Sequence, residues 1–148
     1  MTMSVTLAEA NGIAGAALAR GVELACAPLT VVVLDAGGHP VVVQRQDRSG
    51  ILRVEIATAK AYGSLGMRLP TRNLMARAEH MPRFFDALAV AADGRMIPVA
   101  GGVLIRRDDD VVGAVGVSGD TSDRDEECAV AGIAAMGLTA DTESTEPW

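Results

Sequence analysis

Lys60 is the residue of this sequence whose type and position most clearly suggest chemistry. It is the only charged side chain between Ile56 and Met67, and at helical spacing it shares a face with Ala57 and Ser64. Burial on such a face lowers the pKa of an amine, because the charged form loses its hydration. Lys60 is therefore a candidate base, Schiff-base amine or anchor for a carboxylate ligand. The alternative is an amine that reaches water or forms a salt bridge and has no chemical role.

Three carboxylates are candidates to assist this amine. Asp35 ends an apolar strand before a Gly-Gly turn, where it either points into a pocket or bonds the turn backbone. Asp125 and Glu126 lie in the first turn of the last predicted helix, where the helix dipole alone explains acidic residues. If the chain is an enzyme, we expect its catalytic residues to be Lys60, Asp35 and Asp125.

Glycines are concentrated around two predicted strands in the second half of the chain. They allow a backbone to approach another backbone, or a flat ligand, closely. Their spacing does not match the glycine pattern of a dinucleotide-binding turn. The ligand-binding residues that we expect here are Lys60, Gly101, Gly102, Gly116, Ser118 and Gly119.

The remaining metal-binding residue types are few. His39 and His80 are the only histidines, and neither has the spacing of a metal site, so we expect no bound metal ion. Cys26 and Cys128 are far apart in the sequence, each within an Ala-containing helical pattern, which predicts reduced, packed thiols. Several residues are candidate axial ligands of a haem, although methionines at these spacings also fill core gaps. These candidates are His39, His80, Tyr62, Met67, Met75, Met81 and Met96.

The order of the predicted elements indicates how these residues are positioned. Thr6 and Glu9 form a capping box that begins a first helix, and Ser122 is the predicted cap of a last helix that ends near Leu138. Extended segments at 30–34 and 41–44, and at 103–107 and 111–118, predict two hairpins. Helical patterns occupy 49–67, 71–79 and 83–91. This order predicts an α+β fold with an antiparallel sheet.

Composition limits the classes of function. The 148 residues are 49% hydrophobic, enough for one core, and we expect a single domain at 1–138 and a flexible acidic tail at 139–148. A net charge of −6 and an aromatic content of 3% exclude a nucleic-acid partner. No segment predicts a membrane span, and the N-terminal residues do not resemble a secretion signal, which predicts a cytoplasmic location.

Five segments, taken in order, resemble the GlcG/HbpS family of small haem- or ligand-binding proteins. The likeness extends from Thr6 to about Gly137. The segments are VLDAGGH at 33–39, AKA at 59–61, PVAGGV at 98–103, VGAVGVSG at 112–119 and Asp125-Glu126. The resemblance implies a profilin-like fold, with a five-stranded antiparallel sheet flanked by helices, and a homo-oligomer. It also relates the chain to the C-terminal domain of some corrinoid adenosyltransferases.

The resemblance leaves three hypotheses for the function. The first is a small-ligand-binding protein with haem as the candidate cofactor, although no axial-ligand motif of the family can be matched to this sequence. The second is a cofactor-independent isomerase or lyase that acts on a small carboxylate or aromatic metabolite. The third is an assembly domain whose subunit interface is formed by apolar helix residues such as Leu74, Phe84, Phe85 and Leu88.

Overall fold

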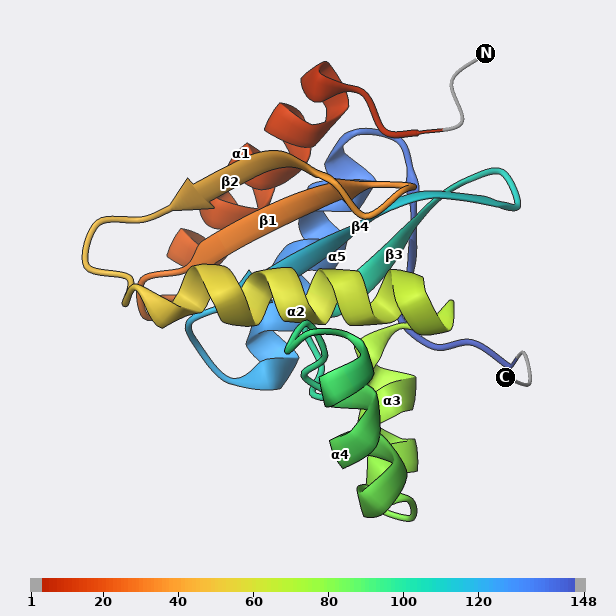
Figure 1. The fold of residues 1–148 in the computed structure, drawn as a ribbon. Coiled ribbons are helices and arrows are strands. Elements are labelled where there is room, and N and C mark those ends of the chain that lie inside the picture. The colour runs from red at the N-terminus through yellow and green to blue at the C-terminus, as the bar shows by residue number, and fades with distance from the viewer. Residues whose placement is uncertain (1–3, 146–148) are drawn as a thin grey trace.

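The computed structural model describes residues 4–145, which form five helices and five strands (Figure 1). In chain order these are α1 (Leu7–Glu23), β1 (Thr30–Asp35), β2 (Pro40–Arg45), α2 (Leu52–Met67), α3 (Thr71–Ala78), α4 (Pro82–Ala91), β3 (Gly102–Arg107), β4 (Asp110–Ser118), α5 (Ser122–Ala135) and β5 (Thr139–Asp141). No helix among these residues is long and apolar enough to cross a membrane.

The strands form one antiparallel sheet in the order β2-β1-β4-β3-β5. Helices α1 and α5 pack side by side on one face of the sheet, and α2 lies on the other (Figure 1). Alternate residues of β1 face these two layers: Val31 and Val33 pack in the α1–α5 core, and Val32 and Leu34 pack under α2. The predicted profilin-like α+β fold, with a five-stranded antiparallel sheet flanked by helices, is confirmed.

Local sequence signals account for most helix ends. Thr6 caps α1 as predicted: its side chain accepts a hydrogen bond from the Glu9 backbone N–H, and Glu9 accepts one from the Thr6 N–H. The predicted cap of α5 is wrong by one residue. Thr121, and not Ser122, has the extended backbone of a cap, and its hydroxyl accepts from the Arg124 N–H.

Strand β5 corrects the prediction that a flexible tail begins at residue 139. Thr139–Asp141 pairs with β3, and the Arg106 side chain donates to Asp141 at 2.9 Å. Ala140 packs against the α1–α5 core. The three residues of β5 are polar or small and show no strand pattern of their own. Their pairing therefore depends on the edge of β3, whose backbone groups they cover. Residues 146–148 of the predicted tail lie outside the described residues.

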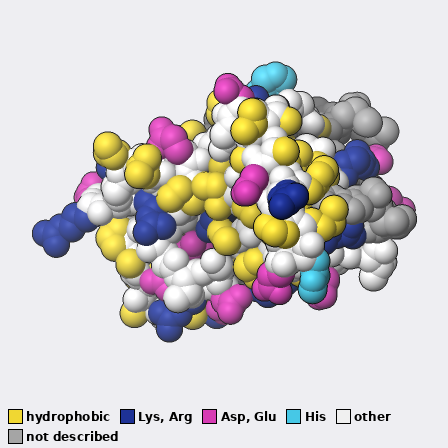
Figure 2. Space-filling view, turned by 60° about the horizontal axis from the view of Figure 1, so that its bottom comes forward, with side chains coloured by type: hydrophobic (Ala, Val, Ile, Leu, Met, Phe, Trp, Pro, Cys, Tyr) yellow, Lys and Arg dark blue, Asp and Glu magenta, His cyan; other side chains and the backbone are white. Residues whose placement is uncertain are grey.

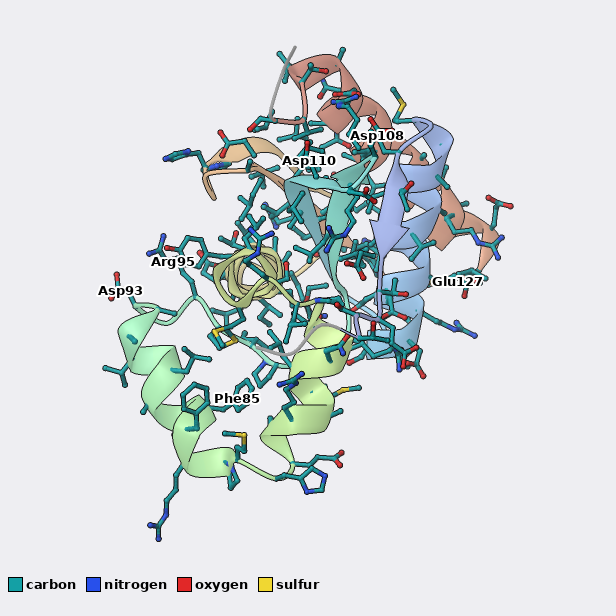
Figure 3. The ribbon with its side chains drawn as sticks, turned by 90° about the vertical axis from the view of Figure 1, so that its right-hand side faces the viewer. Phe85, Asp93, Arg95, Asp108, Asp110 and Glu127 are labelled. Atoms are coloured by element: carbon teal, nitrogen blue, oxygen red, sulfur yellow. The ribbon has the colours of Figure 1, made fainter. Side chains whose placement is uncertain are left out.

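A third, smaller apolar cluster holds the α3–α4 hairpin against the end of α2. It contains Leu69, Leu74, Phe85 and Met96, and Figure 3 shows Phe85 pointing from α4 toward α3. Leu74 and Phe85 are therefore buried within one protomer, which corrects the hypothesis that they form a subunit interface. The sequence could not distinguish these alternatives, because a short apolar helix pattern does not show whether its apolar residues pack within the chain or against another subunit.

The ion pair between Glu9 and Arg107 gives a pH-dependent contribution to stability. The two terminal nitrogens of the Arg107 guanidinium each donate to Glu9 at 2.9 Å, and these bonds, with those from Thr6, lower the pKa of Glu9 from 4.5 to about 2. A lowered pKa stabilises the fold above the unfolded value, so this contribution is lost as pH falls from about 4.5 to about 2. We expect Glu9→Gln to lower the free energy of unfolding by about 1–2 kcal/mol at pH 6.

Urea denaturation at pH 6 and pH 2.5 measures this effect. The difference between wild type and Glu9→Gln should shrink at the lower pH, since Glu9 is then protonated in the unfolded state and begins to protonate in the folded state, so most of the pH-linked stabilisation is lost. Glu55→Gln, on the exposed side of α2, is the control. A difference of the same size at both pH values would show that the charge of Glu9 is not responsible.

Candidate functional site

Helix α2 crosses the sheet at unusually short range, and two of the predicted site glycines make this possible. A Cβ at Gly116 would overlap the carbonyl oxygen of Ala57, and a Cβ at Gly102 would overlap that of Lys60. The space beside these strand residues is therefore filled by the backbone of α2. These two glycines therefore allow another backbone to approach the sheet closely, and the space that a flat ligand would need beside them is already filled.

The same close approach brings Lys60 into contact with the end of β4 and the start of α5. Its amine donates to the Val117 carbonyl at 2.9 Å and to the Asp125 carboxylate at 3.1 Å. Both residues of this ion pair are buried, with 3% of Lys60 and 1% of Asp125 exposed. Gly101, at φ +122°, lies against the amine: a Cβ there would be 2.7 Å from Nζ. The structure thus brings together Lys60, Asp125 and Gly101.

Burial and pairing have opposite effects on this pair. Loss of hydration lowers the pKa of Lys60 and raises that of Asp125, and each partner partly offsets the shift of the other. Asp125 also accepts a hydrogen bond from the Asp120 backbone at 2.9 Å, which fixes the turn before α5. Chemically, the amine can hold a carboxylate or exchange a proton with one, and in this structure that carboxylate is Asp125.

The other predicted site residues lie at different distances from this pair. Ser118 follows Val117 on β4, and its hydroxyl accepts a hydrogen bond from Arg53 at 3.1 Å. Gly119, at φ +154°, packs against the backbone of Pro28. Asp35 is not brought to the pair, because it lies at the opposite end of β1, about 17 Å along the strand from the residue paired with Ser118.

Asp35 is occupied by its own turn. Its carboxylate accepts hydrogen bonds from the backbones of Gly37 and His39, both at 2.9 Å, and lies 3.2 Å from the His39 ring. These bonds lower its pKa although partial burial opposes them. Of the two alternatives for Asp35, pointing into a pocket or bonding the turn backbone, the structure shows the bonds to the turn backbone.

Three hollows lie along the outer side of α2, and none of them is lined by Lys60. An apolar hollow of about 180 Å³ lies between α2 and the end of α4. A second, of about 150 Å³, lies between α2 and the β1–β2 turn, and a third, of about 450 Å³, lies beside Asp93 and Arg95. The first is lined by Tyr62, Gly63, Gly66, Met67, Leu88, Ala91, Ala92 and Met96.

Tyr62 and Gly66 belong to both smaller hollows. The Arg95 guanidinium lies 3.8 Å from the centre of the Tyr62 ring, a cation–π contact, and Figure 3 shows Arg95 beside α2. The Tyr62 ring also borders Gly38, where a Cβ would be 3.1 Å away. From the sequence, Tyr62, Met67 and Met96 are candidate haem ligands, with core packing as the alternative for the two methionines.

Sequence reasoning missed Gly66 and Arg95 as members of this group. The one available signal was Gly66 itself, because a glycine inside a helical pattern usually has a packing or binding reason. Arg95 follows the Asp93-Gly94 turn and has no pattern that places it over a ring 33 positions earlier. The catalytic and ligand-binding roles of Lys60, Asp125 and the strand glycines stay predictions.

We expect Lys60→Met to lower the free energy of unfolding by about 3–5 kcal/mol, because it leaves the buried Asp125 carboxylate without its counter-ion. Adding Asp125→Asn should recover part of this loss, since the amide carries no charge and still accepts from the Asp120 N–H. Urea denaturation measures both variants. Arg83→Met, on the exposed side of α4, is the control. An unchanged midpoint for Lys60→Met would refute this role of the pair.

Comparison with known proteins identifies the family. The model of the haem degrading protein HbpS-like family matches residues 5–134. An uncharacterised 15.0 kDa protein from the dhaT–dhaS intergenic region of Citrobacter freundii is 30% identical over 122 residues, which cover 82% of this chain and 84% of that protein. The corrinoid adenosyltransferase PduO of the same organism is 26% identical over 136 residues, which cover 92% of this chain but only 40% of PduO.

A solved structure, that of a PduOC:heme complex, has the same fold. It superposes with a TM-score of 0.82 over 95% of this chain and 99% of that one, at 24% sequence identity. Because the matched model spans most of the sequence, the chain belongs to the HbpS-like family of haem degrading proteins, as its resemblance to the GlcG/HbpS family predicted.

Proposed function

We propose that this protein binds a small planar ligand, with haem as the first candidate, in the apolar hollow between α2 and α4. The observation that carries the proposal is the arrangement around Tyr62: an apolar hollow of about 180 Å³, an aromatic ring beside it and a cation on that ring. Small-ligand sites combine such an apolar lining with a few placed polar groups. Family membership and the heme complex of a relative support haem as the ligand.

The residues around the hollow fit one part of a haem. Met67 and Tyr62 line it and are of the two types, thioether and phenol, that serve as axial ligands of haem iron. Arg95 would hold a propionate carboxylate. Bound haem would supply an iron centre for redox or oxygen chemistry. Met96 is buried, so it supports the floor of the hollow.

The size of the hollow sets a limit on this arrangement. Sites that enclose drug-sized ligands have volumes of roughly 300–1,000 Å³, and this one has about 180 Å³. A haem would therefore be only partly covered by one protomer. The second hollow, on the other side of Tyr62, extends the same surface toward the β1–β2 turn.

Titration of the purified protein with hemin tests the proposal. We expect a shifted Soret band that saturates near one equivalent per protomer, whereas a featureless and unsaturable rise in absorbance would refute haem binding. Gly66→Leu should weaken binding at least about tenfold, because the new side chain fills both hollows. A Cβ at Gly66 meets no atom within 4 Å, so the fold tolerates it, and removing a helical glycine should raise stability by about 0.5–1 kcal/mol.

Gly15→Leu is the matched control for this variant. Gly15 also lies in a helix, α1, and a Cβ there likewise meets no atom within 4 Å. It should gain similar stability and keep hemin affinity unchanged. If both variants bind as wild type does, the ligand does not occupy the Tyr62 hollow. If Gly66→Leu alone weakens binding, Met67→Leu and Tyr62→Phe are compared for the position of the Soret band, which moves when an axial ligand is lost.

We also propose that the protein forms a homo-oligomer. Figure 2 shows the side of the molecule that carries α3 and α4, on which hydrophobic side chains are frequent. Val90 on α4 and Ile51 before α2 are 81% and 80% exposed. Large exposed apolar groups favour a subunit contact that shields them from water. The cytoplasmic location stays a prediction.

Light scattering coupled to gel filtration measures the assembly. We expect a mass of at least two protomers for the wild type and a smaller mass for Val90→Asp, because a charge at a subunit contact is costly to bury. Val22→Asp, at a valine of α1 that is 72% exposed, is the control. A monomeric wild type at micromolar concentration is incompatible with this proposal.

A further inference from the structure

The two cysteines of the chain, for which the sequence predicts reduced and packed thiols, lie together where the end of α1 packs against α5. Cys128 is on α5 and fully buried, and its sulfur lies 3.8 Å from the Cβ position of Gly21 in the last turn of α1. Cys26 lies five residues after Gly21, beyond the end of the helix, and is partly exposed. The Cys26 side chain packs against the buried core cluster that contains Cys128.

The backbone around Cys26 is held in a defined position. Ala25 adopts the left-handed conformation at φ +55°, which turns the chain back after α1. The Cys26 N–H then donates to the Gly21 carbonyl at 2.9 Å, and the Ala27 N–H donates to the Asp120 carboxylate at 2.8 Å. These bonds fix the backbone on both sides of Cys26, whose side chain packs against the core that contains Cys128.

Only one of the two cysteines is exposed to solvent. A surface hollow of about 350 Å³ is lined by Cys26, Pro28, Gln46 and Asp47. Cys128 is covered and lies behind Cys26 in the α1–α5 core. A small reagent in the hollow thus meets Cys26 first, and Cys128 can react only with a species already formed on Cys26.

We propose that Cys26 and Cys128 form a thiol–disulfide exchange site that accepts small disulfide reagents, with Cys26 as the attacking thiol and Cys128 as the resolving one. In the first step the Cys26 thiolate attacks the reagent RSSR, forming a mixed disulfide and releasing RS⁻. In the second the Cys128 thiolate attacks the Cys26 sulfur, forming the protein disulfide and releasing the second RS⁻. Two protein thiols are oxidised, and one reagent disulfide is reduced to two thiols.

The groups around the thiols set the conditions for this exchange. Burial raises the pKa of Cys26; Asp120 and Asp125 act in the same direction, while Cys128 and Arg124 oppose them. Burial raises the pKa of Cys128 to about 12, with Cys26, Asp125 and Glu127 adding to the shift. Since the thiolate is the nucleophile, exchange is slow at neutral pH and accelerates as pH rises. The nearby carboxylates of Asp47 and Asp120 favour a cationic reagent over an anionic one.

Mass spectrometry after incubation of the folded protein with cystamine, a dicationic disulfide, tests the site. At pH 8.5 the wild type should lose two hydrogens and gain no adduct, and a peptide map should show Cys26 linked to Cys128. Oxidised glutathione, which is anionic, should react several-fold more slowly. The oxidised protein should unfold on the order of 10 °C higher, because the bond closes a long loop.

Two variants separate the roles of the thiols. Cys128→Ala should retain one cysteamine on Cys26, since nothing resolves the mixed disulfide, and Cys26→Ala should remain unmodified while folded. Circular dichroism establishes that each variant is folded, and Cys128→Ser replaces Cys128→Ala if the latter is not. A stable adduct on the wild type, a disulfide between protomers, or no reaction of the folded protein where the unfolded protein reacts would each overturn the proposal.

Discussion

The short distance between α2 and the sheet is the constraint on which the rest of the structure depends. It requires residues without side chains where the helix crosses β3 and β4, and Gly102 and Gly116 occupy those positions. It also traps the side chain of Lys60 between the two layers, where water cannot reach it. A buried ammonium group is tolerated only with partners, so Asp125 and the Val117 carbonyl are a consequence of the same constraint.

This constraint joins parts of the chain that are far apart in sequence. Asp125 belongs to α5, on the opposite face of the sheet from α2, and reaches Lys60 past the end of β4. Its second oxygen accepts from the Asp120 N–H, so one carboxylate fixes both the turn before α5 and the amine on α2. The buried pair therefore specifies how the two helical layers are placed relative to the sheet.

Much of the fold could be predicted from local patterns, because hairpins, capping boxes and helical stripes depend on neighbours in sequence. The two hairpins, the capping box at Thr6 and the long helix carrying Lys60 are of this kind. Strand β5 was missed because its pairing is determined by the edge of β3 and not by its own residues. Asp125, 65 positions from Lys60, was one of three candidate carboxylates, and no local pattern could distinguish it from Asp35 as the partner of the amine.

The candidate site was harder to predict than the fold, since it depends on which faces remain open after packing. Periodicity placed Lys60 and Tyr62 on one helix, but it could not show that the strand glycines would be filled by helix backbone. It also could not show that Arg95 would lie over the Tyr62 ring, because the α3–α4 hairpin comes between them in sequence. Pocket formation is a tertiary property, and local signals carry little information about it.

The buried pair and the hollow are nevertheless coupled through the rotation of α2 about its axis. Lys60 and Tyr62 are two residues apart, so they project from the helix at roughly 200° to one another, on opposite sides. The bonds that hold Lys60 to Asp125 and Val117 fix this rotation, and with it the direction in which the Tyr62 ring leaves the helix. A rigid helix positions binding groups more accurately than a loop does. The inner side of α2 thereby sets the geometry of the hollow on its outer side, between Gly38 and Arg95.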